Sequence, residues 1–149
     1  MSRRTPDRGM DDPYATIGFA LKLAQQALRT RLDAGLREIG LTTPQYAVLA
    51  FLKEEAGASN AELARRAFVT PQTMQGILVT LERAGLISRT AHPEHGRVQQ
   101  TELTAAGADA LEAANRTITE AETRLRKASS PLEVQAVIAL LTRYAEVLR

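Results

Sequence analysis

Residues 59–86 decide the fold, and they read SNAELARRAFVTPQTMQGILVTLERAGL. Ser59, with Glu62 three positions later, is typical of a capping box, which would begin a short helix. Thr70 and Pro71 suit the N-cap and first position of a second helix, because proline loses no hydrogen bond there. The stretch therefore predicts two short helices that are separated by a tight turn.

The second of these helices divides into an apolar face and a polar face. At about 100° per residue, its large apolar side chains fall on one stripe that should face the core. The stripe consists of Met74, Ile77, Leu78 and Leu81. The opposite face carries Gln72, Gln75, Gly76, Val79, Thr80 and Arg83. Glutamine can form two hydrogen bonds with adenine, threonine can bond bases or phosphates, and glycine permits close approach to the groove. This face suits readout of the DNA major groove, but an ordinary solvated helix face would use the same residues.

A β-hairpin is predicted directly after this helix. Gly85 favours a left-handed C-cap, and residues 86–90 and 98–104 then have strand character around a turn that is rich in Pro and Gly. Arg89 lies at the root of this hairpin and Arg97 at its tip. A two-stranded wing that carries arginine can reach an adjacent minor groove or phosphates. The alternative is a solvated hairpin whose arginines only aid solubility.

The candidate DNA-binding residues lie in the two helices and the wing. Phosphate neutralisation dominates affinity for DNA, so the clustering of arginines here counts for more than the formal net charge of +2. The candidates are Arg65, Thr70, Gln72, Thr73, Gln75, Gly76, Thr80, Arg83, Arg89 and Arg97.

The remaining segments predict a helical dimerisation frame. Residues 13–40 form a long amphipathic segment that Gly40 should cap, Thr43 with the following proline should open a helix to about residue 55, and two apolar helices fill residues 105–149. Terminal helices this apolar need a partner, either a second subunit or the rest of the same chain. The candidate dimerisation residues are Ile17, Leu21, Val134, Val137, Ile138, Leu141 and Leu148.

Length and composition exclude several classes of protein. With 149 residues, 44% of them hydrophobic, the chain can bury a core as one folded unit. No apolar run approaches the ~20 residues of a membrane span, and no apolar segment follows the polar first residues, so we expect a cytoplasmic protein without a membrane partner. The chain has no cysteine, which excludes disulfides, thiolate metal sites and cysteine-based peroxide sensing.

From about residue 16 to residue 149, the chain resembles the MarR family of winged helix-turn-helix regulators. The matching segments are LTTPQYAVL at 41–49, AELA at 61–64, LERAGLISR at 81–89 and LTAAG at 103–107. The resemblance implies a mostly α fold with a small β-hairpin wing and a homodimer whose terminal helices interleave. It also implies a transcriptional regulator, a ligand-responsive repressor that binds a pseudo-palindromic operator in double-stranded DNA.

The same pattern divides the chain into three parts. These are an N-terminal arm at 1–12, a helical dimerisation region at 13–40 and 105–149, and a winged helix-turn-helix region at 41–104.

The wing tip departs from the family's Asp-Pro-x-Asp-x-Arg pattern. His92 and His95 stand where the two aspartates would be, and Arg97 is retained. With Glu94 between them, the two imidazoles could bind zinc or nickel, which would make a metal-responsive regulator. We favour a solvated turn, and we predict no metal, no cofactor and no catalytic residue.

An effector site is implied only by the resemblance, since many relatives hold small, often aromatic or anionic, molecules between the frame and the DNA-binding region. The candidate wall residues are Phe19, Leu23, Gln26, Tyr46 and Phe51, all of which also fit plain core roles. The sequence does not identify the effector. A winged-helix protein-interaction module that has lost operator binding stays open as the alternative function.

Overall fold

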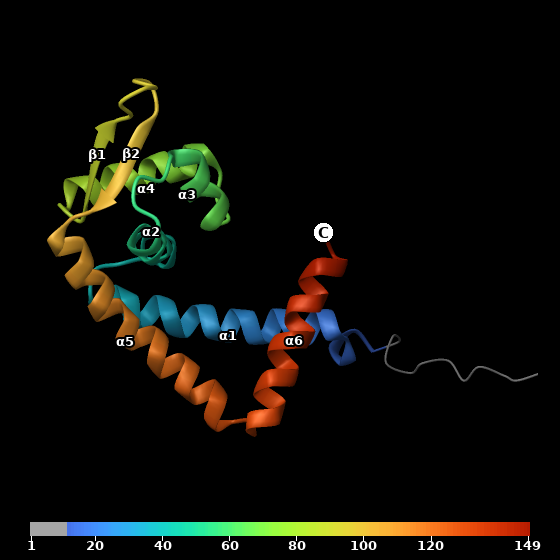
Figure 1. Ribbon diagram of the computed structural model, residues 1–149. Helices are drawn as coiled ribbons and strands as arrows, with labels where there is room; N and C mark the ends of the chain where they lie inside the picture. The colour runs from blue at the N-terminus through green and yellow to red at the C-terminus, as the bar shows by residue number, and fades with distance from the viewer. Residues whose placement is uncertain (1–11) are drawn as a thin grey trace, which may run out of the picture.

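The computed structural model describes residues 12–149, so nearly all of the predicted N-terminal arm lies outside the described residues. The chain is mostly helical with one two-stranded antiparallel hairpin, as predicted (Figure 1). After a 3-10 turn at Pro13–Ala15, the elements are α1 (Ile17–Glu38), α2 (Thr43–Glu54), α3 (Asn60–Arg66), α4 (Pro71–Arg83), β1 (Ile87–Ala91), β2 (Gln99–Leu103), α5 (Ala105–Lys127) and α6 (Pro131–Val147). No helix in this part of the chain is long and apolar enough to cross a membrane.

The predicted helix starts at α3 and α4 are confirmed by their hydrogen bonds. The Ser59 hydroxyl accepts from the Glu62 amide at 3.3 Å, and the Glu62 carboxylate accepts from the Ser59 amide at 2.7 Å. Thr70 caps α4 by accepting from the Thr73 amide at 3.1 Å. Local chemistry therefore places both helices of the helix-turn-helix.

The predicted start of α2 is wrong by one residue. Thr42 is the N-cap: its hydroxyl accepts from the Gln45 amide at 3.3 Å, and the Gln45 side chain accepts from the Thr42 amide at 3.0 Å. Only Thr42 has a glutamine three positions later, which completes a capping box. Thr43 is the first helical residue, and its hydroxyl instead donates to Asp33 of α1 at 2.5 Å.

Two glycine caps end helices as predicted. Gly40 and Gly85 have φ values of 77° and 75°. The Leu41 amide donates to the Leu36 carbonyl at 2.9 Å after the first cap, and the Leu86 amide donates to the Leu81 carbonyl at 3.0 Å after the second. These bonds turn the chain sharply, so that α1 meets α2 and α4 meets the hairpin.

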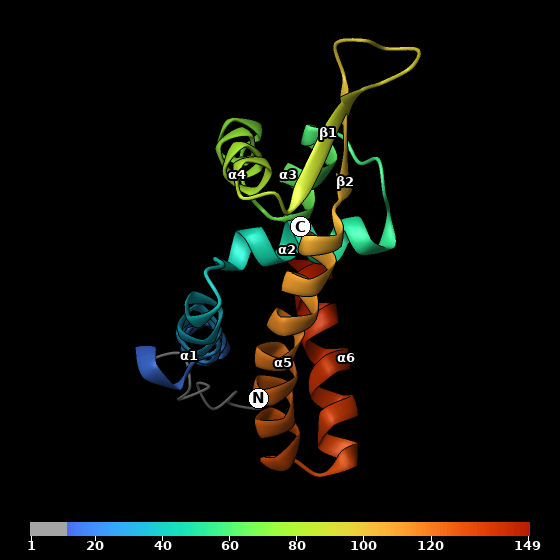
Figure 2. The same ribbon diagram turned by 90° about the vertical axis from the view of Figure 1, so that its left-hand side faces the viewer.

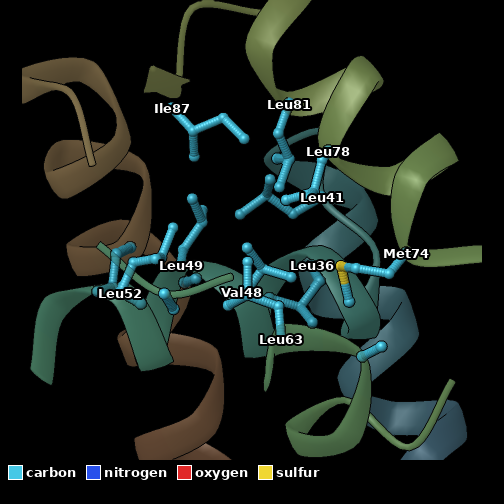
Figure 3. Close-up of a cluster of buried hydrophobic side chains, with 14 residues drawn as sticks. Leu36, Leu41, Val48, Leu49, Leu52, Leu63, Met74, Leu78, Leu81 and Ile87 are labelled. Atoms are coloured by element: carbon cyan, nitrogen blue, oxygen red, sulfur yellow. The ribbon is translucent and has the colours of Figure 1, made fainter. Parts of the chain in front are cut away.

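The hydrophobic core lies among α2, α3, α4 and the start of β1, and also includes the end of α1 and part of α5 (Figure 3). Its largest buried side chains are Leu36, Leu49, Leu63, Met74, Leu78, Leu81 and Leu111. We call the part formed by α2, α3, α4 and the β1–β2 hairpin the head, and the part formed by α1, α5 and α6 the frame. The head and the frame occupy opposite ends of the molecule in both views (Figures 1 and 2).

The frame is open. Helices α1 and α5 pack together, whereas α6 diverges from α5 after their connecting turn and packs closely on no other element of the described chain (Figure 1). No residue of α6 is buried, and Leu132 and Leu148 at its two ends are 79% and 81% exposed. Residues 12–149 of a single copy therefore leave the apolar side chains of α6 uncovered.

Candidate nucleic-acid interface

Helix α4 presents the predicted polar face to solvent. Gln72, Gln75 and Thr80 are exposed, as are the other candidates of this helix, Thr73, Gly76 and Arg83. Met74, Leu78 and Leu81 are buried on the opposite side. Ile77, predicted as core, and Val79, predicted on the exposed face, are both half-buried. The division into two faces is thus confirmed, while base contacts by these residues stay a prediction.

Gly76 leaves the exposed face of α4 without a side chain at its position. A Cβ atom built at Gly76 would meet no atom within 4 Å beyond its chain neighbours and the nearby backbone of its own helix. No internal packing therefore requires glycine at this position in the described structure. A partner that approaches α4 closely would give it a purpose.

The arginines of the head fall into two groups. Arg65, Arg83 and Arg97 are exposed, and none of them forms an ion pair with a carboxylate of residues 12–149. Arg66 pairs weakly with Glu55 at 3.9 Å and lies over the ring of Phe51. Arg65, Arg83 and Arg97 are therefore free to neutralise phosphates.

Arg89 differs from the other candidate arginines. Its side chain is 10% exposed and forms an ion pair with Glu82 at 2.7 Å. It also donates from Nε to Glu82 at 2.9 Å and from Nη1 to the Gln75 side-chain oxygen at 3.3 Å. Arg89, which was predicted to contact DNA, therefore binds two side chains of α4 instead.

The sequence analysis did not predict that Arg89 contacts Glu82 and Gln75, although the alternation of side chains along β1 indicates that Arg89 points inward. Side chains alternate along a strand, so Arg89 points to the same side of β1 as Ile87, which is buried. That side faces α4. The alternation pointed Arg89 inward, and only the fold shows which side chains it meets.

The wing tip uses a histidine as a hydrogen-bond acceptor. His92 Nδ1 accepts from the amides of Glu94 and His95, at 3.1 and 3.2 Å. An imidazole thus supplies an acceptor where the family pattern has aspartate. The ring centroids of His92 and His95 lie 5.1 Å apart. The described residues nevertheless hold no group of three or more His, Cys, Asp and Glu side chains placed to bind a metal ion.

A polar cleft of about 330 Å³ separates α4 from the wing. Gln75 and Leu78 line it from α4, and Arg89, Arg97 and Gln99 line it from the hairpin. Both predicted wing arginines therefore border one space next to the exposed face of α4. This arrangement suits a strand of nucleic acid that passes between the helix and the wing.

The five candidate effector residues are not brought together. Leu23 and Gln26 line a cavity of about 620 Å³ between α1 and α5, whereas Phe19 lies outside it against Tyr14. Tyr46 and Phe51 pack against the hydrophobic core. The Tyr46 hydroxyl donates to Asn115 at 3.0 Å, and burial raises the pKa of Tyr46.

Charged residues of the same cavity were missed by the sequence reasoning. Arg31, Glu38, Arg116 and Glu120 all line it, and Arg31 pairs with Glu120 at 3.7 Å. In the sequence these residues are indistinguishable from those of solvated helix faces. Only the packing of α1 against α5 makes them walls of a cavity.

Known proteins are similar to this chain in sequence and in fold. A sequence model of the MarR family matches residues 39–98. The HTH-type transcriptional repressor Rv2887 of Mycobacterium tuberculosis is 38% identical over 111 residues, which span 74% of this chain and 80% of that protein. The crystal structure of Rv2887 in complex with salicylic acid has a TM-score of 0.70 at 32% identity and covers 91% of this chain and 98% of that one.

A DNA-bound protein has a similar fold. The transcriptional repressor CouR, bound to a 23-mer DNA duplex, has a TM-score of 0.82 at 26% identity and covers 97% of this chain and 99% of that chain. Its likeness extends over the head and the frame together. With this fold, and with the identity shared with Rv2887, the chain belongs to the MarR family of winged helix-turn-helix transcriptional regulators.

Proposed function

We propose that the protein is a repressor that binds a pseudo-palindromic operator as a homodimer, with α4 in the major groove and the wing beside it. The exposed polar face of α4, bare at Gly76 and flanked by the cleft to the wing, is the observation that carries this proposal. A helix enters the major groove only if its surface is free and its polar groups can reach base edges. The similarity to a repressor bound to a DNA duplex supports the same arrangement.

We assign different tasks to the candidate residues. Gln72, Gln75 and Thr80 would address base edges, because their polar side chains are exposed on this helix. Arg65, Arg83 and Arg97 would supply charge toward phosphates or the minor groove, together with Thr70 and Thr73 at the start of α4. The proposal assigns the protein no catalytic role, and it places the protein in the cytoplasm, where a regulator reaches the chromosome.

The homodimer is inferred from the open frame. Besides its two ends, α6 exposes Val137, Ile138 and Leu141, and α1 exposes Ile17 near its start. Fully burying one such side chain stabilises by about 1.5–3 kcal/mol, so several of them give a strong drive to associate. We infer that a second copy covers them, so that residues 13–40 and 105–149 act as the dimerisation region and residues 41–104 bind DNA.

The decisive experiment is a mobility-shift assay with DNA from upstream of the protein's own coding sequence. A shifted band that specific competitor DNA removes, and nonspecific DNA does not, is expected. If no DNA is bound, the protein-interaction alternative replaces operator binding. Repeating the assay with a chelator and with added zinc tests a metal response through His92 and His95, and we expect the same affinity in both.

We also propose that an aromatic carboxylate relieves repression by binding between α1 and α5. The cavity there is lined by Arg31 and Arg116, which can pair with a carboxylate, and by Leu23 on the apolar side. Rv2887 was crystallised with salicylic acid, a molecule of this class. Titration of the protein–DNA complex with salicylate tests the proposal: release of DNA is expected, and weaker release is expected from Arg116→Ala.

A further inference from the structure

Arg89 connects the wing to α4 through two side chains at once. Its Nε and Nη2 atoms lie 2.9 and 2.7 Å from the same carboxylate oxygen of Glu82, and its Nη1 donates to Gln75 at 3.3 Å. Glu82 lies near the end of α4, and Gln75 lies two turns earlier. The carboxylate thus fixes the guanidinium plane, and the remaining edge of that plane reaches Gln75.

This contact determines how the Gln75 amide is turned. A guanidinium group carries only donors, so the Gln75 atom that faces it must be the carbonyl oxygen. The NH₂ group then points away from Arg89, and no other side chain or backbone group of residues 12–149 forms a hydrogen bond with the Gln75 amide. The exposed face of α4 therefore presents a donor at this position.

Gln72 provides a natural comparison one turn earlier on the same helix face. It is exposed like Gln75, but no hydrogen bond to its side chain exists among the described residues. Its amide is free to rotate and can present the oxygen, the NH₂ group or both. The two glutamines of α4 therefore differ in their freedom of orientation.

We propose that Arg89 is a positioning residue that makes Gln75 select guanine in preference to adenine at the base it meets. This inference rests on the proposed function, because it assumes that α4 lies in the major groove. Adenine offers a donor beside an acceptor, and bidentate pairing with it needs both the oxygen and the NH₂ group of a glutamine. Guanine offers two neighbouring acceptors, N7 and O6, which suit an amide that leads with its donor.

Lysine cannot replace Arg89 in this role. An ammonium group can keep the ion pair with Glu82, but it lacks the planar fork that reaches a second acceptor in a fixed direction. The variant Arg89→Lys therefore keeps the charge of the wing and releases the Gln75 amide. This variant therefore separates the effect of the Gln75 orientation from the effect of the positive charge at position 89.

The test is a competition binding assay on operators that carry each of the four bases at every half-site position. Wild type should prefer guanine over adenine at one position, and Gln75→Ala should abolish that preference there. Arg89→Lys should reduce it by about fivefold or more, since a good base contact discriminates roughly 5- to 150-fold. In a Gln75→Ala background, Arg89→Lys should change nothing further at that position.

Gln72 and the salt dependence are the controls. Gln72→Ala identifies the base position that Gln72 contacts, and Arg89→Lys should leave the base preference at that position unchanged. The Arg89→Lys variant should also keep the wild-type slope of log affinity against log salt concentration. If Arg89→Lys lowers the melting temperature strongly, Glu82→Gln, which keeps the arginine and weakens its anchor, should reproduce the relaxed preference.

Three results would overturn the proposal. One is a wild-type preference for adenine, or none, at the Gln75 position, while the protein still binds its operator. Another is an Arg89→Ala variant whose salt slope falls by about one unit with base preference intact, which would make Arg89 a phosphate contact. A wild-type protein that binds no DNA would overturn the proposed function and this inference together.

Discussion

Replacing Gly76 with leucine should stabilise the protein and at the same time weaken its binding to DNA. The position lies in the interior of α4, and a Cβ atom there would meet no atom from the rest of the described fold within 4 Å. In a helix interior, alanine is favoured over glycine by about 0.8–1.0 kcal/mol, and leucine is nearly as good as alanine. For a domain of about 150 residues, this corresponds to an increase in melting temperature of roughly 2–4 °C.

The effect on DNA binding has the opposite sign. A leucine at the centre of the exposed face would hold α4 away from the groove floor, so that Gln72, Gln75 and Thr80 could not all reach base edges. Each good base contact is worth about 1–3 kcal/mol. Losing one in each half of a dimer's operator would cost about 2–6 kcal/mol, which is a factor of roughly 30 to 20,000 in affinity.

The assay pairs thermal melting with fluorescence anisotropy on a labelled operator, for wild type, Gly76→Ala and Gly76→Leu. Both variants share the backbone effect and differ in how far the side chain reaches, so the alanine variant should be equally stabilised and bind better than the leucine variant. Unchanged operator affinity in Gly76→Leu, with the expected gain in melting temperature, would refute the placement of α4 in the groove.

Four further outcomes are expected. Truncation after Ser130, which removes α6, should leave a folded head that sediments as a monomer; a truncated dimer as tight as the full chain would contradict the proposed interface. Arg97→Ala should weaken specific and nonspecific DNA binding by similar factors and lower the salt slope by up to about one unit, whereas a selective loss of specificity would point to base readout instead. At the wing tip, His92→Asp should keep DNA affinity because a carboxylate can accept both backbone amides, while His92→Ala should reduce it; equal affinities in all three proteins would show that this turn needs no acceptor. The pKa of Glu62 is lowered, first of all by the hydrogen bond from the Ser59 amide, so the stability that Glu62 adds is present above its ordinary pKa and is lost as pH falls through the lowered value. Denaturant titrations of wild type and Glu62→Gln should therefore differ at neutral pH and converge in acid.

Local chemistry made much of the head predictable. The caps at Ser59 and Thr70 and the glycine turns at Gly40 and Gly85 each depend on residues within a few positions of one another, so the sequence contains all that decides them. At the start of α2 two threonines stand side by side, and Gln45, which completes the capping box of Thr42, decides between them.

The candidate site was predictable in outline but not in its contacts. The period of α4 placed Gln75 outward, yet its partner Arg89 is fourteen positions away, and its position depends on how the hairpin packs against the helix. The walls of the cavity between α1 and α5 likewise come from two helices that are about eighty residues apart in the chain. Tertiary packing selects these pairs, and periodicity within one element carries no information about them.

The uncovered surface of α6 has a consequence for how the regulator responds to its own abundance. Among the described residues the buried core lies outside α6, and in the proposed homodimer a second copy covers this helix. At concentrations below the dimer dissociation constant, the amount of dimer grows with the square of the amount of protein. A twofold rise in synthesis then gives a fourfold rise in operator-binding species. A frame that is completed only by association thus gives the repressor a steeper dose response than a monomer with the same DNA-binding head.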